Sequence, residues 1–102
     1  MLDFGRLAID TRAREVRVAG AAIALTAREY DLLQFLASHP RQAFTRDQLF
    51  ERFWGEFGDR HSLTVHIGRI REKIEADPAN PRYIATVWGV GYRFEGQQYE
   101  GQ

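Results

Sequence analysis

Several residue types that mark special protein classes are absent or rare in this chain of 102 residues. It has no cysteine, three prolines, one methionine and a single lysine among its 14 basic residues. The absence of cysteine excludes a disulfide scaffold and thiol chemistry. A hydrophobic content of 44% with 13% aromatic residues is enough for a packed core, which excludes disordered and collagen-like chains. One ordinary globular domain is therefore expected.

Long hydrophobic runs are also missing. The longest apolar stretch, residues 18–25, contains a glycine and four alanines and is far shorter than the ~20 residues of a membrane-spanning helix. No signal peptide pattern is found, so a cytoplasmic protein is expected.

A net charge of one sign is lacking as well, because 14 acidic residues balance the 14 basic ones. A domain that binds phosphates without sequence preference would usually be basic overall. Residues 60–93, however, hold six basic side chains against three acidic ones. This segment is where an anionic partner is expected to bind.

Hydrophobic periodicity divides the chain into strands, helices and a hairpin. Apolar and polar residues alternate over residues 7–25, which predicts short antiparallel strands with one buried face. Two capping boxes, Thr26–Glu29 and Thr45–Gln48, predict helices that run to Ser38 and to Trp54.

A third helix is predicted from Ser62, as its N-cap, to about Ala76. Its apolar residues recur along one face, so the opposite face, with Val65 and Arg69, should be exposed. Residues 83–94 contain Trp-Gly-Val-Gly between two apolar segments, which indicates a β-hairpin of two strands. Three helices followed by a hairpin is the order of elements in a winged helix.

Four ordered motifs run through residues 25–94. They are Leu25-Thr-x-x-Glu29-Tyr-x-Leu-Leu33, Arg46-x-x-Leu49 with Trp54-Gly55, Thr64-Val-His-Ile67 with Arg69-Ile-Arg-x-Lys73-Ile, and Thr86-Val-Trp-Gly-Val-Gly-Tyr-Arg-Phe94. Together they resemble the C-terminal effector domain of OmpR/PhoB-type response regulators. The resemblance implies an α+β fold over residues 1–102, a winged helix-turn-helix. It would comprise an N-terminal four-stranded antiparallel sheet (1–25), three helices (26–76) and a C-terminal hairpin wing (83–94).

The same resemblance implies a function. It is sequence-specific binding of double-stranded promoter DNA and transcription regulation, normally controlled by phosphorylation of an N-terminal receiver domain that these residues do not include. Neither a cofactor, a metal nor an enzymatic activity is implied. The expected assembly is a monomer alone and a tandem pair on direct repeats. By position, the residues that resemble DNA contacts are Trp54, Arg60, Ser62, Val65, His66, Arg69, Arg71, Trp88, Gly89 and Tyr92. The loop expected to contact RNA polymerase consists of Gly55, Glu56, Phe57, Gly58 and Asp59.

This sequence departs from the family pattern at several of these positions. Gly68 and His61 stand where the family often has arginine, and Arg60 is shifted by one residue from the second of these places. Trp88 stands where many members carry an arginine that enters the minor groove. Whether Arg60 replaces the arginine missing at residue 61 is left open by the sequence.

Other functions are weighed against DNA binding. His61 and His66 are five residues apart and ~140° apart around a helix, which is the wrong geometry for a shared metal ion. Asp59, His61 and Ser62 lie too close together in sequence for a hydrolase triad. The alternative function is a winged helix that binds only another protein, which a net charge of zero would suit. Salt dependence separates the two, because phosphate binding weakens as salt increases.

Overall fold

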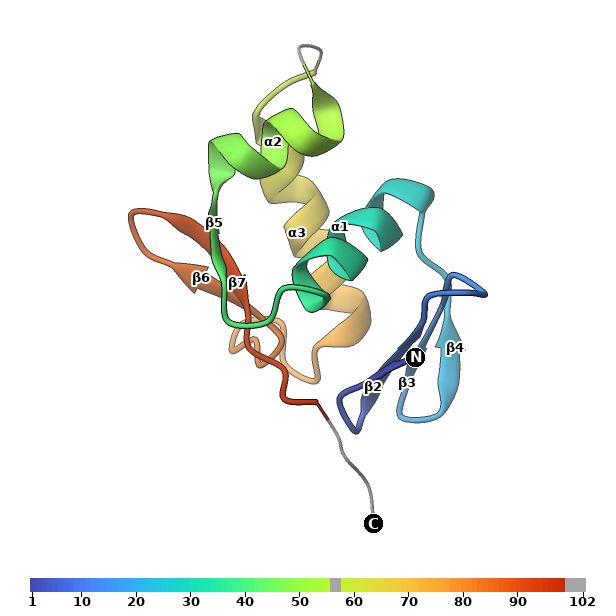
Figure 1. The fold of residues 1–102 in the computed structure, drawn as a ribbon. Coiled ribbons are helices and arrows are strands. Elements are labelled where there is room, and N and C mark those ends of the chain that lie inside the picture. The colour runs from blue at the N-terminus through green and yellow to red at the C-terminus, as the bar shows by residue number, and fades with distance from the viewer. Residues whose placement is uncertain (56–57, 99–102) are drawn as a thin grey trace.

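Two antiparallel sheets flank three helices in the computed structural model, which describes residues 1–55 and 58–98 (Figure 1). The strands are β1 (Leu2–Asp3), β2 (Leu7–Asp10), β3 (Glu15–Val18), β4 (Ala21–Ile23), β5 (Ala43–Thr45), β6 (Ile84–Val87) and β7 (Gly91–Phe94). The helices are α1 (Ala27–Ala37), α2 (Arg46–Trp54) and α3 (His61–Ile74). None of the helices in the described ranges is both long and apolar enough to cross a membrane.

The first sheet has the order β1-β2-β3-β4 and confirms the predicted N-terminal four-stranded sheet. Leu7 and Ile9 of β2 are fully buried, and they lie opposite Val18 and Val16 of β3. The alternation seen in the sequence therefore directs one face of this sheet toward the helices.

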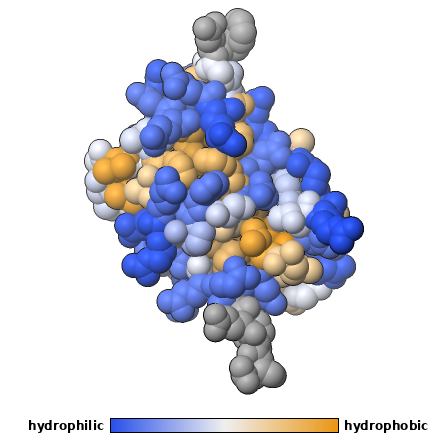
Figure 2. Space-filling view, in the orientation of Figure 1, coloured by the Kyte–Doolittle hydropathy of each residue, from blue (hydrophilic) through white to orange (hydrophobic). Residues whose placement is uncertain are grey.

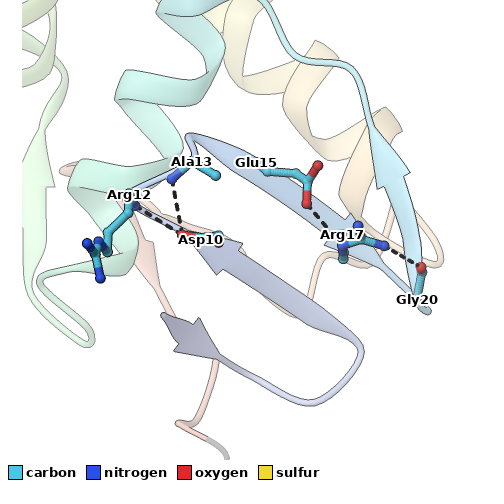
Figure 3. A network of polar contacts seen from close by, with 6 residues as sticks. All are labelled: Asp10, Arg12, Ala13, Glu15, Arg17 and Gly20. Carbon is cyan, nitrogen blue, oxygen red and sulfur yellow. Dashed lines mark hydrogen bonds and ion pairs between the residues drawn. The ribbon is translucent and has the colours of Figure 1, made fainter.

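Two groups of polar contacts lie along this sheet and its turns (Figure 3). The Asp10 carboxylate accepts the amides of Arg12 and Ala13 at 3.1 Å, which closes the turn between β2 and β3. Arg17 donates to the Glu15 carboxylate and to the carbonyl of Gly20. These exposed contacts join β2 to the turn that follows it, and β3 to the turn before β4.

Both predicted capping boxes are present. The Thr26 hydroxyl accepts the amide of Glu29 at 3.2 Å, and the Glu29 carboxylate accepts the amide of Thr26 at 2.9 Å. Thr45 and Gln48 make the same pair of bonds at 3.0 and 2.8 Å. Because each box satisfies two amides that a helix start would leave unpaired, it fixes where α1 and α2 begin.

Two boundary predictions were wrong. Ser62 does not cap α3, which begins one residue earlier, at His61, with Arg60 as its N-cap residue. The amide of His61 donates instead to the Asp59 carboxylate at 2.9 Å. The helix ends at Ile74 rather than near residue 76.

The C-terminal hairpin is also larger than predicted. β6 and β7 pair as expected, but β5 adds a third strand with the order β5-β7-β6. Phe44 lies opposite Tyr92 in this pairing. The sheet thereby ties the hairpin to the segment between α1 and α2.

Apolar residues of every helix and both sheets form one core. Its largest fully buried side chains are Phe94, Leu7, Ile9, Leu32, Leu33, Leu36, Leu49, Leu63, Ile67, Ile70, Ile74 and Ile84. The surface in Figure 2 is mostly hydrophilic, with smaller groups of apolar residues between the polar ones.

One carboxylate within this core joins α1 to α3. Glu29 is only 1% exposed and accepts from the Lys73 ammonium of α3 at 2.6 Å. Burial raises the pKa of Glu29, but the hydrogen bonds from Lys73 and from the Thr26 amide oppose it, so the net pKa is lowered. A carboxyl whose pKa is lower in the folded state than in the unfolded chain stabilises the fold when it is ionised.

We expect Glu29→Gln to lower the free energy of unfolding at pH 7 by about 1.5–3 kcal/mol, the usual contribution of hydrogen bonds to a charged group. The contribution of Glu29 is complete above the unfolded pKa of about 4.3 and is lost as pH falls through the lower folded value. The difference between parent and variant should therefore shrink below about pH 4. Urea unfolding at several pH values measures it, with the exposed Glu51→Gln as control. A constant difference from pH 7 to pH 3 would contradict this account of Glu29.

Candidate nucleic-acid interface

One face of α3 is buried in the core, and the opposite face is the one that the sequence predicts to be functional. Leu63, Ile67, Ile70 and Ile74 point into the core and are at most 2% exposed, as predicted. At 100° per residue, Arg69 and Val65 lie on the opposite side, where Arg69 is exposed and Val65 is half-buried. A Cβ built on Gly68 would contact nothing within 4 Å. Because glycine places no side chain in this open space, the helix backbone is accessible there.

His66 lies on one flank of α3 against α2. Its Nδ1 donates to the carbonyl of Ser62 at 2.8 Å, and its ring meets the Trp54 ring edge-on, with centroids 5.1 Å apart. A carbonyl can only accept, so Nδ1 carries the proton. The other ring nitrogen, Nε2, has no partner among the residues that the structure describes and is the atom that a ligand could contact.

Trp54 belongs to a short aromatic column between the helices. Its ring stacks on Phe50 with centroids 5.7 Å apart and planes 5° apart. The guanidinium of Arg28 lies 5.0 Å from the Trp54 centroid, and that of Arg60 lies 5.3 Å from the Phe50 centroid. Each ring thus carries one arginine in cation–π geometry.

A hollow of about 320 Å³ separates the N-termini of α2 and α3. The residues that line it are Arg46, Asp47, Phe50, Arg60, His61, Leu63 and Thr64. Arg60 reaches across it and forms an ion pair with Asp47. Arg46, which the sequence analysis named only as part of a motif, lies in the first turn of α2 beside this hollow.

The hairpin tip carries the most exposed large apolar side chain of the described residues. Trp88 is 87% exposed, and the following residue, Gly89, has a φ of 79° that favours glycine. Gly91 is required for another reason, because a Cβ there would lie 2.1 Å from the carbonyl oxygen of Phe44. The first glycine shapes the turn, and the second allows β5 to pack closely.

The last turn of α3 holds the hairpin through the backbone of Ile84. Arg71 donates from Nε and Nη2 to the Ile84 carbonyl at 3.0 and 2.8 Å, and from Nη2 to the Thr86 hydroxyl at 2.9 Å. Four residues later, just beyond the end of α3, the Glu75 carboxylate accepts the amide of Ile84 at 3.0 Å. We call this pair of side chains, Arg71 and Glu75, the Ile84 clamp.

Glu75 makes further bonds within this clamp. It also accepts the amides of Arg82 at 2.7 Å and Tyr83 at 3.0 Å, and it is only 6% exposed. Backbone donors thus replace the water that a buried carboxylate loses. The carboxylate therefore determines where the chain enters β6.

Two residues expected to contact DNA, Arg71 and Tyr92, instead make contacts within the fold. Burial lowers the pKa of Arg71, whose Nε and Nη2 already bond to β6. Tyr92 is 3% exposed, and the Arg71 guanidinium lies 5.6 Å from its ring centroid. Helical position predicted the direction of Arg71 but could not show that Ile84 lies within its reach.

The predicted polymerase-contact loop lies next to α2. Gly55 ends that helix with a φ of 67°, and Gly58 and Asp59 are exposed. Glu56 and Phe57 lie outside the described residues. Across the described ranges, no group of three or more His, Asp or Glu residues is arranged to hold a metal ion.

Comparison with known proteins places this architecture in a family. Residues 20–94 match the family described as "Transcriptional regulatory protein, C terminal". The DNA-binding domain of RstA from Klebsiella pneumoniae, solved in complex with the RstA box, is 35% identical with a TM-score of 0.83. The match covers 94% of this chain and 97% of that one. The chain belongs to the OmpR/PhoB-type C-terminal regulatory domains.

Other relatives of this regulatory domain are longer proteins. The response regulator DrrB of Thermotoga maritima, an OmpR/PhoB homologue, is 44% identical with a TM-score of 0.88, over 92% of this chain and 43% of that one. The DNA-binding response regulator MtrA of Mycolicibacterium smegmatis is 47% identical over 95 residues, which are 91% of this chain and 42% of that protein. The chain spans half the length, or less, of these relatives.

We expect Glu75→Gln to speed hydrogen exchange at the amides of Arg82, Tyr83 and Ile84. A glutamine offers one acceptor oxygen instead of two and turns an NH₂ group toward backbone donors. The free energy of unfolding should fall by about 1.5–3 kcal/mol. Amide exchange followed by NMR measures the local effect, with Glu72→Gln on the exposed face of α3 as the matched control. Equal exchange in the two variants would contradict the role assigned to Glu75.

Proposed function

We propose that this regulatory domain binds double-stranded promoter DNA in a sequence-specific manner, with α3 as the recognition helix in the major groove. The observation that carries the proposal is the outward face of α3 with exposed Arg69 and half-buried Val65, held beside an exposed hairpin tip by the Ile84 clamp. A major groove ~12 Å wide admits one helix. The solved complex of the RstA domain with its box is a precedent in the family.

The side chains divide into three roles. Arg69, Val65 and Ser62 face the bases, because arginine can bond to guanine and an apolar group can contact a thymine methyl. Trp54 and His66 face phosphates on one flank of α3. Trp88 and Gly89, at the tip of the wing, reach the backbone or minor groove on the other flank.

Arg60, Arg71 and Tyr92 take different places in this proposal. Arg60 is held by Asp47 over the hollow between α2 and α3, and a DNA phosphate would have to replace that carboxylate. Arg71 and Tyr92 are positioning residues for the wing, since both are packed beneath it.

The whole protein is proposed to be a cytoplasmic response regulator. This domain is proposed to have no catalytic activity. An N-terminal receiver domain would control it by phosphorylation, as the family placement favours. Two copies would occupy direct repeats whose centres lie about one helical turn, ~10–11 bp, apart. The Gly55–Asp59 loop would contact RNA polymerase, and this segment includes Glu56 and Phe57.

The test is DNA binding by the purified domain after selection from random duplexes. We expect log K to fall linearly with log[salt], by ~0.9 for each phosphate contacted. Arg69→Ala should weaken binding to the selected site by ~1–3 kcal/mol and leave the unfolding midpoint unchanged, because no core contact is removed.

Arg12→Ala, an exposed arginine in the turn between β2 and β3, is the control and should bind like the parent. No enrichment of any sequence, or affinity that is independent of salt, would reject DNA binding in favour of a protein-interaction module. An Arg69→Ala domain that binds as tightly as the parent would reject only the assignment of Arg69.

A further inference from the structure

The two arginines of the aromatic column differ in their partners. Arg60, over Phe50, is paired with the Asp47 carboxylate. Arg28, over Trp54, is exposed and makes no hydrogen bond or ion pair with any residue in the described ranges. Its guanidinium is held on a ring face, yet its N–H donors remain available to an anion.

The position of Arg28 in α1 is defined by the capping box. It lies between Thr26 and Glu29, whose mutual hydrogen bonds fix the first turn of the helix. The neighbouring carboxylate of Glu29 does not neutralise it, since Glu29 is buried and bonded to Lys73. The unpaired amides of this helix start add partial positive charge near Arg28.

Arg28 also lies on a defined side of the recognition helix. The Trp54 ring, over which the Arg28 guanidinium lies, contacts His66 on one flank of α3. Arg71 contacts the wing from the other flank. The two flanks are about 140° apart around the helix, because His66 and Arg71 are five residues apart. A helix in the major groove has a phosphate backbone on each side. The wing therefore approaches one backbone, and the Arg28–Trp54 pair approaches the other.

We infer that Arg28 is a phosphate contact of the DNA backbone, on the strand opposite the one that the wing approaches. Trp54 holds the guanidinium in place through its ring face, so little side-chain freedom is lost when the phosphate binds. The contact is independent of base sequence, because it is made to the backbone. This inference rests on the proposed DNA binding and adds to it a residue of α1.

The experiment measures the salt dependence of binding for Arg28→Gln on the selected site and on a scrambled duplex. The slope of log K against log[salt] should become less steep by about 0.9, the value for one phosphate. Affinity should fall roughly three- to tenfold on both duplexes, since a backbone contact weakens all sequences alike. Arg28→Lys should keep the slope, because the charge is retained.

Arg41→Gln is the matched control, because Arg41 is also exposed and follows the opposite end of α1. It should leave the slope unchanged. A parent domain without salt-dependent DNA binding would overturn the proposed function and this inference together. A parent that binds while Arg28→Gln keeps the full slope would overturn this inference alone. So would a slope change in Arg41→Gln of the same size.

Discussion

The orientation of the β6–β7 hairpin relative to α3 depends on the backbone of one residue, Ile84. Arg71, in the last turn of α3, bonds to its carbonyl, and Glu75, the residue that follows the helix, bonds to its amide. Ile84 and Glu75 are buried and Arg71 is half-buried, so loss of either side chain would leave a backbone group of Ile84 without that hydrogen bond. The clamp joins the two elements that are proposed to meet DNA, although they are separated by the loop of residues 75–83.

The rest of the fold supports that junction from two sides. The guanidinium of Arg6, before β2, donates to the carbonyl of Ile74 at the end of α3, and Glu29 holds Lys73 from α1. On the other side, β5 pairs with β7, so the hairpin is part of a three-stranded sheet. The exposed face of α3 is thus set by contacts along its buried and flanking faces, while its outer residues remain available to a ligand.

Local sequence patterns predicted most of the fold, because capping boxes and hydrophobic periods act within a few residues. Thr26 and Thr45 identified the starts of α1 and α2 correctly. β5 was missed because three residues show no period and their partner strand lies near residue 92. For the candidate site, the outer face of α3 was predictable, but the roles of Arg71 and Arg28 depend on contacts with Ile84 and Trp54 that are distant in sequence.

We expect the Ile84 clamp to hold α3 and the β6–β7 hairpin together as one rigid unit. Residual dipolar couplings of the backbone amides test it most directly. The account predicts that α3 and β6–β7 of the parent fit a single alignment tensor. In Arg71→Gln, the hairpin-tip couplings should depart from the tensor that fits α3, while the first sheet still follows it. A variant in which helix and hairpin still share one tensor would contradict the account.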